Sequence, residues 1–315
     1  MVPHAYNTST EFILVGLSDD HETQILLFIV ILLIYIFALV GNAWIILLVQ
    51  TNSHLQTPMY FFLTQLSIVE IVYVNTTIPQ ILAHLLEGHA ELSLTRCALQ
   101  MHTALALAVT ESLLLGVMAY DRYLAICHPL TYATAMERQH QFQLASTCWI
   151  ASFLIATICV SLTFSHPFCG PCCVQHFICE IPMVLRLACD DTFITEIIIF
   201  AFAALALLCP ASIILTSYGL ILVSLFQLSS ASRLRKALST CGSHLAVVMM
   251  FYGIATFVYL KPQTGATADI DKQIAVFYVV VTPLLNPIIY TLRNKDVHEA
   301  MAKMVRTWGF KQKGH

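Results

Sequence analysis

Long apolar stretches alternate with short polar connections along the whole chain. The apolar stretches fall at about 24–49, 58–86, 97–121, 140–161, 193–227, 238–260 and 271–292. Each allows a helix of roughly 20 or more residues, enough to cross a hydrocarbon core about 30 Å thick. Strands of a membrane barrel need only about 10 alternating residues, so a barrel is not expected. The pattern predicts an all-α membrane protein, a bundle of seven spanning helices.

The composition supports a bilayer environment. Hydrophobic residues make up 58% of the chain and charged residues 10%, and the mean hydropathy is +0.78. A surface that faces water needs far more charge than this. Prolines inside the expected spans, which should bend them, are Pro79, Pro210, Pro283 and Pro287.

The basic residues predict which way the bundle is oriented. If the N-terminus is outside, four of the 15 Lys and Arg residues are external and eleven are internal. Cytoplasmic loops carry such an excess, so we expect an extracellular N-terminus and a cytoplasmic C-terminus. The expected regions are therefore an extracellular N-terminus (1–23), the seven-helix domain (24–292), and a cytoplasmic amphipathic helix with its tail (293–315).

The first residues carry two further signals. They lack a basic segment followed by a continuous apolar core, so a cleaved signal peptide is not expected. Asn7 opens a glycosylation sequon on the expected outer side, whereas the sequon at Asn75 lies inside a span and should be silent.

The third span ends in an acid–base pair. Arg122 lies 25 residues after Cys97, or about 38 Å along a helix, so Asp121 and Arg122 are expected at the cytoplasmic mouth of the bundle. One interpretation is an interfacial arginine with a neighbouring counter-ion. The other is a functional switch.

Short motifs in successive spans favour the switch. They are Gly41-Asn42, "PMY" at 58–60, "DRY" at 121–123, Trp149, Pro210 and "NPIIY" at 286–290. This series resembles the rhodopsin-like G-protein-coupled receptors. Longer strings resemble the vertebrate odorant receptors: "TPMYFFLTQLSIVE" (57–70), "MAYDRYLAICHPLTY" (118–132), "SY" (217–218), "KALSTCGSHL" (236–245), "FYG" (251–253) and "PLLNPIIYTLRN" (283–294).

The resemblance implies a function and a location. It implies a receptor, not an enzyme, that binds a small volatile odorant and activates an olfactory-type stimulatory G protein to raise cyclic AMP. Its place would be the plasma membrane of olfactory cilia, in contact with lipid; no nucleic-acid partner is expected. The implied switch residues are Asp121, Arg122, Tyr123, Tyr218, Asn286, Pro287 and Tyr290. The basic stretch at 233–236 could contact the G protein or be an ordinary cytoplasmic anchor.

The resemblance also implies disulfide bonds and a ligand site. The implied disulfides are Cys97–Cys179 and Cys169–Cys189; sequence alone leaves Cys97–Cys189 open, with Cys172 and Cys173 as extra thiols. An apolar pocket with a few hydroxyl groups is expected, with Tyr259 as the preferred polar anchor and Thr256 second. The candidate ligand residues are Ala104, Leu105, Ala108, Val109, Ser112, Cys159, Phe202, Ala206, Tyr252, Ala255, Thr256, Tyr259 and Tyr278.

Two acids lie inside spans, Glu70 and Glu111. The resemblance implies that both face the interior near Asn42 and Asn286. Two close carboxylates do not both ionise without a cation, so a sodium ion or one shared proton is expected, or else a neutral acid with ordinary hydrogen bonds. No other cofactor is expected.

Other classes of membrane protein fit less well. His176 with Cys179 has metal-binding chemistry, but no second cluster completes a site, so we expect no metal and a solvated His176. The two halves of the sequence do not resemble each other, so the internal repeat that is typical of many transporters is not indicated. Residues 273–292 contain no lysine for a retinal Schiff base, and no catalytic motif is present. A non-olfactory receptor of the same superfamily, for another small neutral ligand, is the nearest alternative.

Overall fold

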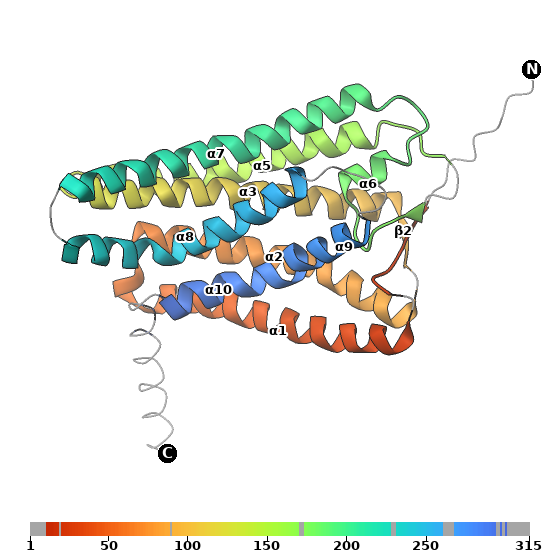
Figure 1. The fold of residues 1–315 in the computed structure, drawn as a ribbon, viewed down its shortest axis with the longest axis horizontal. Helices are drawn as coiled ribbons and strands as arrows, with labels where there is room; N and C mark the ends of the chain where they lie inside the picture. The colour runs from red at the N-terminus through yellow and green to blue at the C-terminus, as the bar shows by residue number, and fades with distance from the viewer. Residues whose placement is uncertain are drawn as a thin grey trace, which may run out of the picture.

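The computed structural model describes residues 11–18, 20–88, 90–169, 173–227, 231–260, 268–293, 297 and 300. In the segments 193–227, 231–260 and 268–293, its side-chain description covers 193–226, 241–256 and 272–290. Over these residues the molecule is a bundle of long helices that lie side by side (Figure 1). The predicted all-α helical bundle is confirmed.

The first five spans correspond to α1 (His21–Thr51), α2 (Pro58–Glu87), α3 (Leu94–Cys127), α5 (Arg138–Thr163) and α7 (Phe193–Gln227). The sixth is α8 (Ala231–Leu260), and the last consists of α9 (Ala268–Val276), the π-helical turn η3 (Phe277–Val281) and α10 (Thr282–Arg293). Short helices in the connections are η1 (Ser53–Leu55), α4 (Tyr132–Ala135) and α6 (Ile181–Leu185).

Length and hydropathy make most of these helices able to cross a membrane. Six described helical segments qualify, and α8 contributes a shorter apolar stretch at Cys241–Thr256. Helix α3 is central, because it contacts α2, α5, α7 and α8. Residues on α3 can therefore meet partners from most of the bundle.

A small sheet lies at the end of the bundle where β2 is labelled (Figure 1), and the sequence pattern did not predict this sheet. Strand β1 (Glu11–Leu14) lies between β2 (Ala90–Ser93), to which it is antiparallel, and β3 (Cys173–Val174), to which it is parallel. Phe12 is fully buried, and its ring packs against Phe164 and Phe168. Residues 11–14 are thus packed against the connections between α2 and α3 and between α5 and α7.

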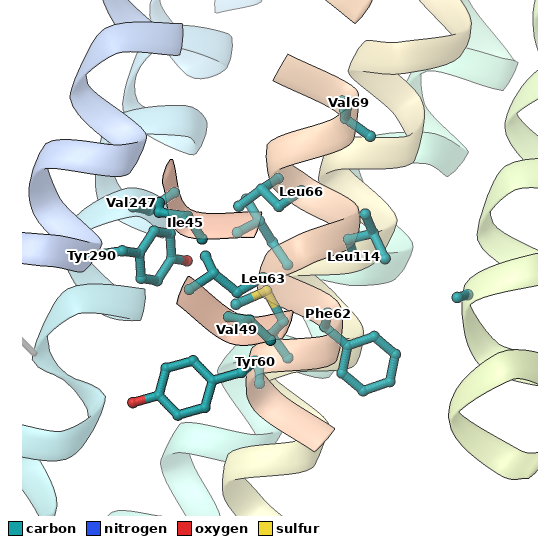
Figure 2. Close-up of a cluster of buried hydrophobic side chains, with 14 of the residues drawn as sticks. Ile45, Val49, Tyr60, Phe62, Leu63, Leu66, Val69, Leu114, Val247 and Tyr290 are labelled. Atoms are coloured by element: carbon teal, nitrogen blue, oxygen red, sulfur yellow. The ribbon is translucent and has the colours of Figure 1, made fainter. Parts of the chain in front are cut away.

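At the other end, a buried apolar cluster holds the helices together (Figure 2). Tyr290 and Phe62 are among its largest fully buried side chains. Members labelled in Figure 2 are Ile45, Val49, Tyr60, Phe62, Leu63, Leu66, Val69, Leu114, Val247 and Tyr290.

Candidate functional site

At the cytoplasmic end of α3, Asp121 is fully buried and holds two partners. Its Oδ2 accepts hydrogen bonds from Arg122 Nε (3.1 Å) and Nη2 (2.6 Å). Its Oδ1 accepts from the hydroxyl of Tyr132 in α4, at 2.7 Å. Burial and the neighbouring Asp121 raise the pKa of Tyr132, so this hydroxyl keeps its proton at neutral pH. The structure therefore shows Arg122 folded onto its own neighbour.

Tyr123 and Tyr218 have other partners. Tyr123 Oη lies 2.9 Å from His128 Nε2. Tyr218 Oη lies 2.7 Å from Nδ1 of His244, whose Nε2 lies 3.1 Å from the carbonyl oxygen of Leu115. A carbonyl only accepts, so Nε2 carries the proton and Tyr218 donates to Nδ1. His244 thus joins α3, α7 and α8.

In the middle of the bundle, Asn286 joins the two intramembrane acids. Its Nδ2 donates to Glu70 Oε1 and to Glu111 Oε1, the latter at 3.2 Å. Its Oδ1 is buried and has no hydrogen-bond partner among the described residues, nor does the hydroxyl of Tyr290. The structure brings Glu70, Glu111 and Asn286 together.

Asn42 bonds elsewhere, although the resemblance implied that it lies close to this group. Its Nδ2 donates to the carbonyl oxygens of Ala38 (3.0 Å) and Pro283 (3.2 Å). Pro287 has no N–H and lies four residues after Pro283, so the Pro283 carbonyl lacks its helical donor. Asn42 supplies that donor from α1.

A matching contact lies between α3 and α7. Pro210 leaves the carbonyl of Ala206 without its helical donor. The hydroxyl of Ser112 donates to this carbonyl at 2.9 Å, and Ser112 Oγ lies 3.1 Å from Tyr252 Oη on α8. Ser112 is 1% exposed, whereas Tyr252 is only partly buried. This set, Ser112, Ala206, Pro210 and Tyr252, is called the Pro210 junction below.

The outer end is tied together around Cys179 and Glu180. Disulfide bonds join Cys97 to Cys179 and Cys169 to Cys189. The backbone N–H of Cys179 donates to Gln100 Oε1 on α3 at 3.0 Å. Glu180 accepts a hydrogen bond from Tyr278, which lies in the π-helical turn of the last span. Residues 179–180 thus connect the long loop to both α3 and the last span.

The candidate ligand residues are distributed over several packing clusters. Leu105, Cys159 and Phe202 pack in the cluster that contains the Cys97–Cys179 disulfide. Tyr252 packs against the inner cluster and Tyr278 against a third cluster around α2. Val109 and Ala206 are buried, Ala104, Ala108 and Ala255 partly buried, and Thr256 exposed. The side chain of Tyr259 and all of Asn7 lie outside the described residues.

One expectation is wrong. His176 is not solvated but 2% exposed, its ring stacked on Phe177 at 4.6 Å between centroids, and its Nδ1 accepts from the backbone N–H of Ile178. Among the described residues, no group of three or more His, Cys, Asp or Glu side chains could hold a metal ion. Cys173 lies in β3 with a free thiol, and Cys172 lies outside the described residues.

Five polar side chains in these contacts were not expected from the sequence, namely Gln100, His128, Tyr132, Glu180 and His244. His244 and Gln100 are polar residues inside apolar spans, and that alone marks them as candidates. Glu180 had no comparable signal, because it lies in a polar loop.

Comparison with known proteins identifies the family. A family model described as olfactory receptor matches residues 31–307. Human olfactory receptor 10C1 is 46% identical over 302 residues, which cover 95% of this chain and 97% of that protein. Human olfactory receptor 10R2 is 46% identical over 296 residues (94% and 88%), and mouse olfactory receptor 2V1 is 42% identical over 292 residues (93% and 93%).

Relatives of this similarity, over nearly full length and on a bundle of this kind, assign the chain to a class of receptors and not of enzymes. The chain belongs to the olfactory receptor family, as a multi-pass plasma-membrane receptor that senses odorants and couples to G proteins.

Proposed function

We propose that this receptor binds small, mostly apolar volatile molecules in a transmembrane pocket and activates an olfactory-type stimulatory G protein to raise cyclic AMP. The proposed site lies between α3, α5, α7 and α8, with Tyr278 at its border. Apolar side chains dominate there, and hydroxyl groups are the main polar ones. Such surroundings favour neutral odorants that make one or two hydrogen bonds.

The observation that supports the proposal is that Asp121 has two hydrogen-bond partners, Arg122 and Tyr132. Arg122 and Tyr132 occupy both oxygens of one fully buried carboxylate. In the proposed switch this arrangement is one of two states: a ligand that favours the other state shifts the equilibrium and releases Arg122 toward the G protein. His244 and Tyr218 tie α8 to α3 and α7 in the same inner half.

The test is cyclic AMP in cells that express the full chain with an olfactory-type stimulatory G protein, screened against a diverse odorant panel. We expect a dose-dependent rise that is lost in Arg122→Ala at equal surface expression. Arg138→Ala is the matched control, because Arg138 is an exposed cytoplasmic arginine at the start of α5. A response only to non-odorant ligands would favour a non-olfactory role, and a full response in Arg122→Ala would contradict the switch.

We also propose that Glu70 and Glu111 share either a sodium ion or one proton. Two carboxylates that share one amide donor repel each other unless a positive charge lies between them. The buried Asn286 Oδ1, which has no partner among the described residues, is a third oxygen that fits a hard cation. A bound cation would neutralise the pair and hold α2, α3 and α10 together.

Thermal unfolding of the purified receptor in sodium chloride against choline chloride tests this proposal. Stabilisation by sodium that is lost in Glu70→Gln would support the ion. Sodium-independent stability that falls as the pH rises would support the shared proton. Insensitivity to both would contradict the proposal.

A further inference from the structure

The hydrogen-bond directions in the Pro210 junction limit the kind of ligand that can bind to it. Ser112 has one hydroxyl proton. Its oxygen lies 2.9 Å from the Ala206 carbonyl, an atom that can only accept, so this proton goes to Ala206. The Ala206 carbonyl needs it, because Pro210 cannot donate and lipid offers no substitute.

The direction of the next hydrogen bond follows. Since Ser112 has already used its proton, the 3.1 Å contact with Tyr252 is a hydrogen bond only if Tyr252 donates. The proton of Tyr252 is then committed to Ser112. The phenol oxygen keeps only its accepting capacity for any further partner. Tyr252 is partly buried, so this oxygen belongs to a side chain that is not fully enclosed by protein.

The hydroxyl proton of Tyr278, a second tyrosine of the candidate site, is also committed to a protein acceptor. Tyr278 donates its proton to the carboxylate of Glu180 and likewise keeps only accepting capacity. Of the four described hydroxyl-bearing candidates, Ser112, Tyr252 and Tyr278 have their protons committed to protein atoms. Thr256 is the exposed fourth.

We infer that the site selects odorants that donate a hydrogen bond, such as alcohols and phenols, over odorants of the same skeleton that only accept one, such as ethers and esters. The donor would bind the oxygen of Tyr252. An acceptor-only odorant would place its oxygen against that of Tyr252, with no proton between them. This inference rests on the proposed odorant site and adds its chemical selectivity.

The central experiment removes the group that holds the Tyr252 proton. The wild-type receptor is compared with Ser112→Ala on matched pairs of odorants, each a primary alcohol and its methyl ether, at equal surface expression. We expect the wild type to respond to the alcohol at a concentration about fivefold to tenfold lower than to the ether, as one net hydrogen bond allows. In Ser112→Ala the freed proton of Tyr252 can serve an ether, so the ratio should fall toward one or invert.

Three variants serve as controls for the role of Ser112. Ser112→Thr keeps a hydroxyl and should keep the preference. Thr110→Val is the matched control, because Thr110 lies on the same helix and its hydroxyl donates to a carbonyl of that helix, Ala106 O, at 2.8 Å. Thr256→Val should leave the ratio unchanged, and a preference that depends on Thr256 would overturn the inference.

A second readout separates this inference from the proposed signalling. Alcohol and ether are compared by the rise in unfolding temperature that each gives the purified receptor. Stabilisation by the alcohol alone, without a cyclic AMP response, would support the selectivity and contradict the choice of G protein. Equal stabilisation, or an ether preference, overturns the inference even where signalling is normal. No stabilisation and no response to any odorant overturns both.

Discussion

Pro210 and Pro287 each remove one hydrogen-bond donor from a helix, and in both cases a side chain of a neighbouring helix replaces that donor. Pro210 leaves the carbonyl of Ala206 without a donor, and Pro287 does the same to Pro283. Ser112 on α3 donates to the first carbonyl, and Asn42 on α1 donates to the second. A glycine faces each proline ring: Gly116 opposite Pro210, and Gly41 opposite Pro287.

The two replacement contacts differ in the number of helices that they join. Asn42 uses its amide on the Pro283 carbonyl and on Ala38 of its own helix, so the contact joins two helices. The Pro210 junction continues from Ser112 to Tyr252 and joins three, α3, α7 and α8. The missing donor at Pro287 is thus replaced by a contact that only joins two helices. The missing donor at Pro210 is replaced by Ser112, which also contacts the hydroxyl of Tyr252, a candidate ligand residue.

The largest expected effect comes from filling the space beside the prolines. A Cβ on residue 116 would lie 2.9 Å from Pro210 Cβ and 3.3 Å from its Cα, whereas one on residue 41 would meet only ring atoms of Pro287, at 3.1 and 3.2 Å. Because a main-chain atom cannot move aside like a ring atom, Gly116→Ala should destabilise by about 1–3 kcal/mol and Gly41→Ala by less. Thermal unfolding of the purified receptor measures both.

Gly219→Ala is the matched control, since a Cβ there meets nothing within 4 Å and the residue lies in α7. It should be neutral or slightly stabilising, as alanine favours helix. Equal losses of stability in Gly116→Ala and Gly41→Ala would mean that Pro210 and Pro287 make room for the added methyl group equally well.

The second prediction asks whether Ser112 acts on the defect that Pro210 creates. Ser112→Ala should lower the free energy of unfolding by about 1–2 kcal/mol, because the Ala206 carbonyl then lacks a donor. In a Pro210→Ala background residue 210 regains its N–H, so the same substitution should cost less than half as much. Unfolding of the four chains gives the coupling energy.

Thr110→Val serves as the control in this cycle, because its hydroxyl bonds within its own helix. Its cost should not depend on residue 210. Ser112→Ala could lower the free energy of unfolding by the same amount with and without Pro210. That result would show that Ser112 stabilises the protein through packing and not through its hydrogen bond to the Ala206 carbonyl.

The corresponding cycle at the other proline should give a smaller value. Asn42→Leu should cost about 1 kcal/mol, since the bond to Pro283 is longer, at 3.2 Å, and the amide also serves Ala38. Pro287→Ala should remove most of this cost. A coupling larger than that between Ser112 and Pro210 would reverse the comparison and make the Pro287 site the more dependent one.

How far the sequence could predict these features depends on the range of each interaction. The spans, their direction and the prolines follow from local composition, because a bilayer imposes length and hydropathy on every crossing segment. The partners do not follow. Ser112 and Ala206 are 94 positions apart, and Asn42 and Pro283 are 241 apart, so only the packing of the helices makes them neighbours.

The outer loops show the limit most clearly. "EFIL" at 11–14 is too short to predict a strand, and it becomes one only because β2 and β3 lie on either side of it. His176 was expected in water because its loop is polar, yet the loop folds inward and stacks its ring on Phe177. The burial of a loop residue depends on which other segments pack against it, and the local sequence does not determine those segments.

The substitution with the smallest expected effect on stability distinguishes the Pro210 junction most clearly from the contact between Asn42 and Pro283. Tyr252→Phe removes a donor from Ser112 but leaves the Ala206 carbonyl satisfied, so the free energy of unfolding should fall by only about 0.5 kcal/mol. The same substitution should abolish the preference for alcohols over ethers, because the accepting oxygen is gone. Asn42→Leu should do the opposite, with a measurable loss of stability and an unchanged preference. A loss above about 2 kcal/mol in Tyr252→Phe would place Tyr252 among the packing residues, and the two prolines would then play the same structural role.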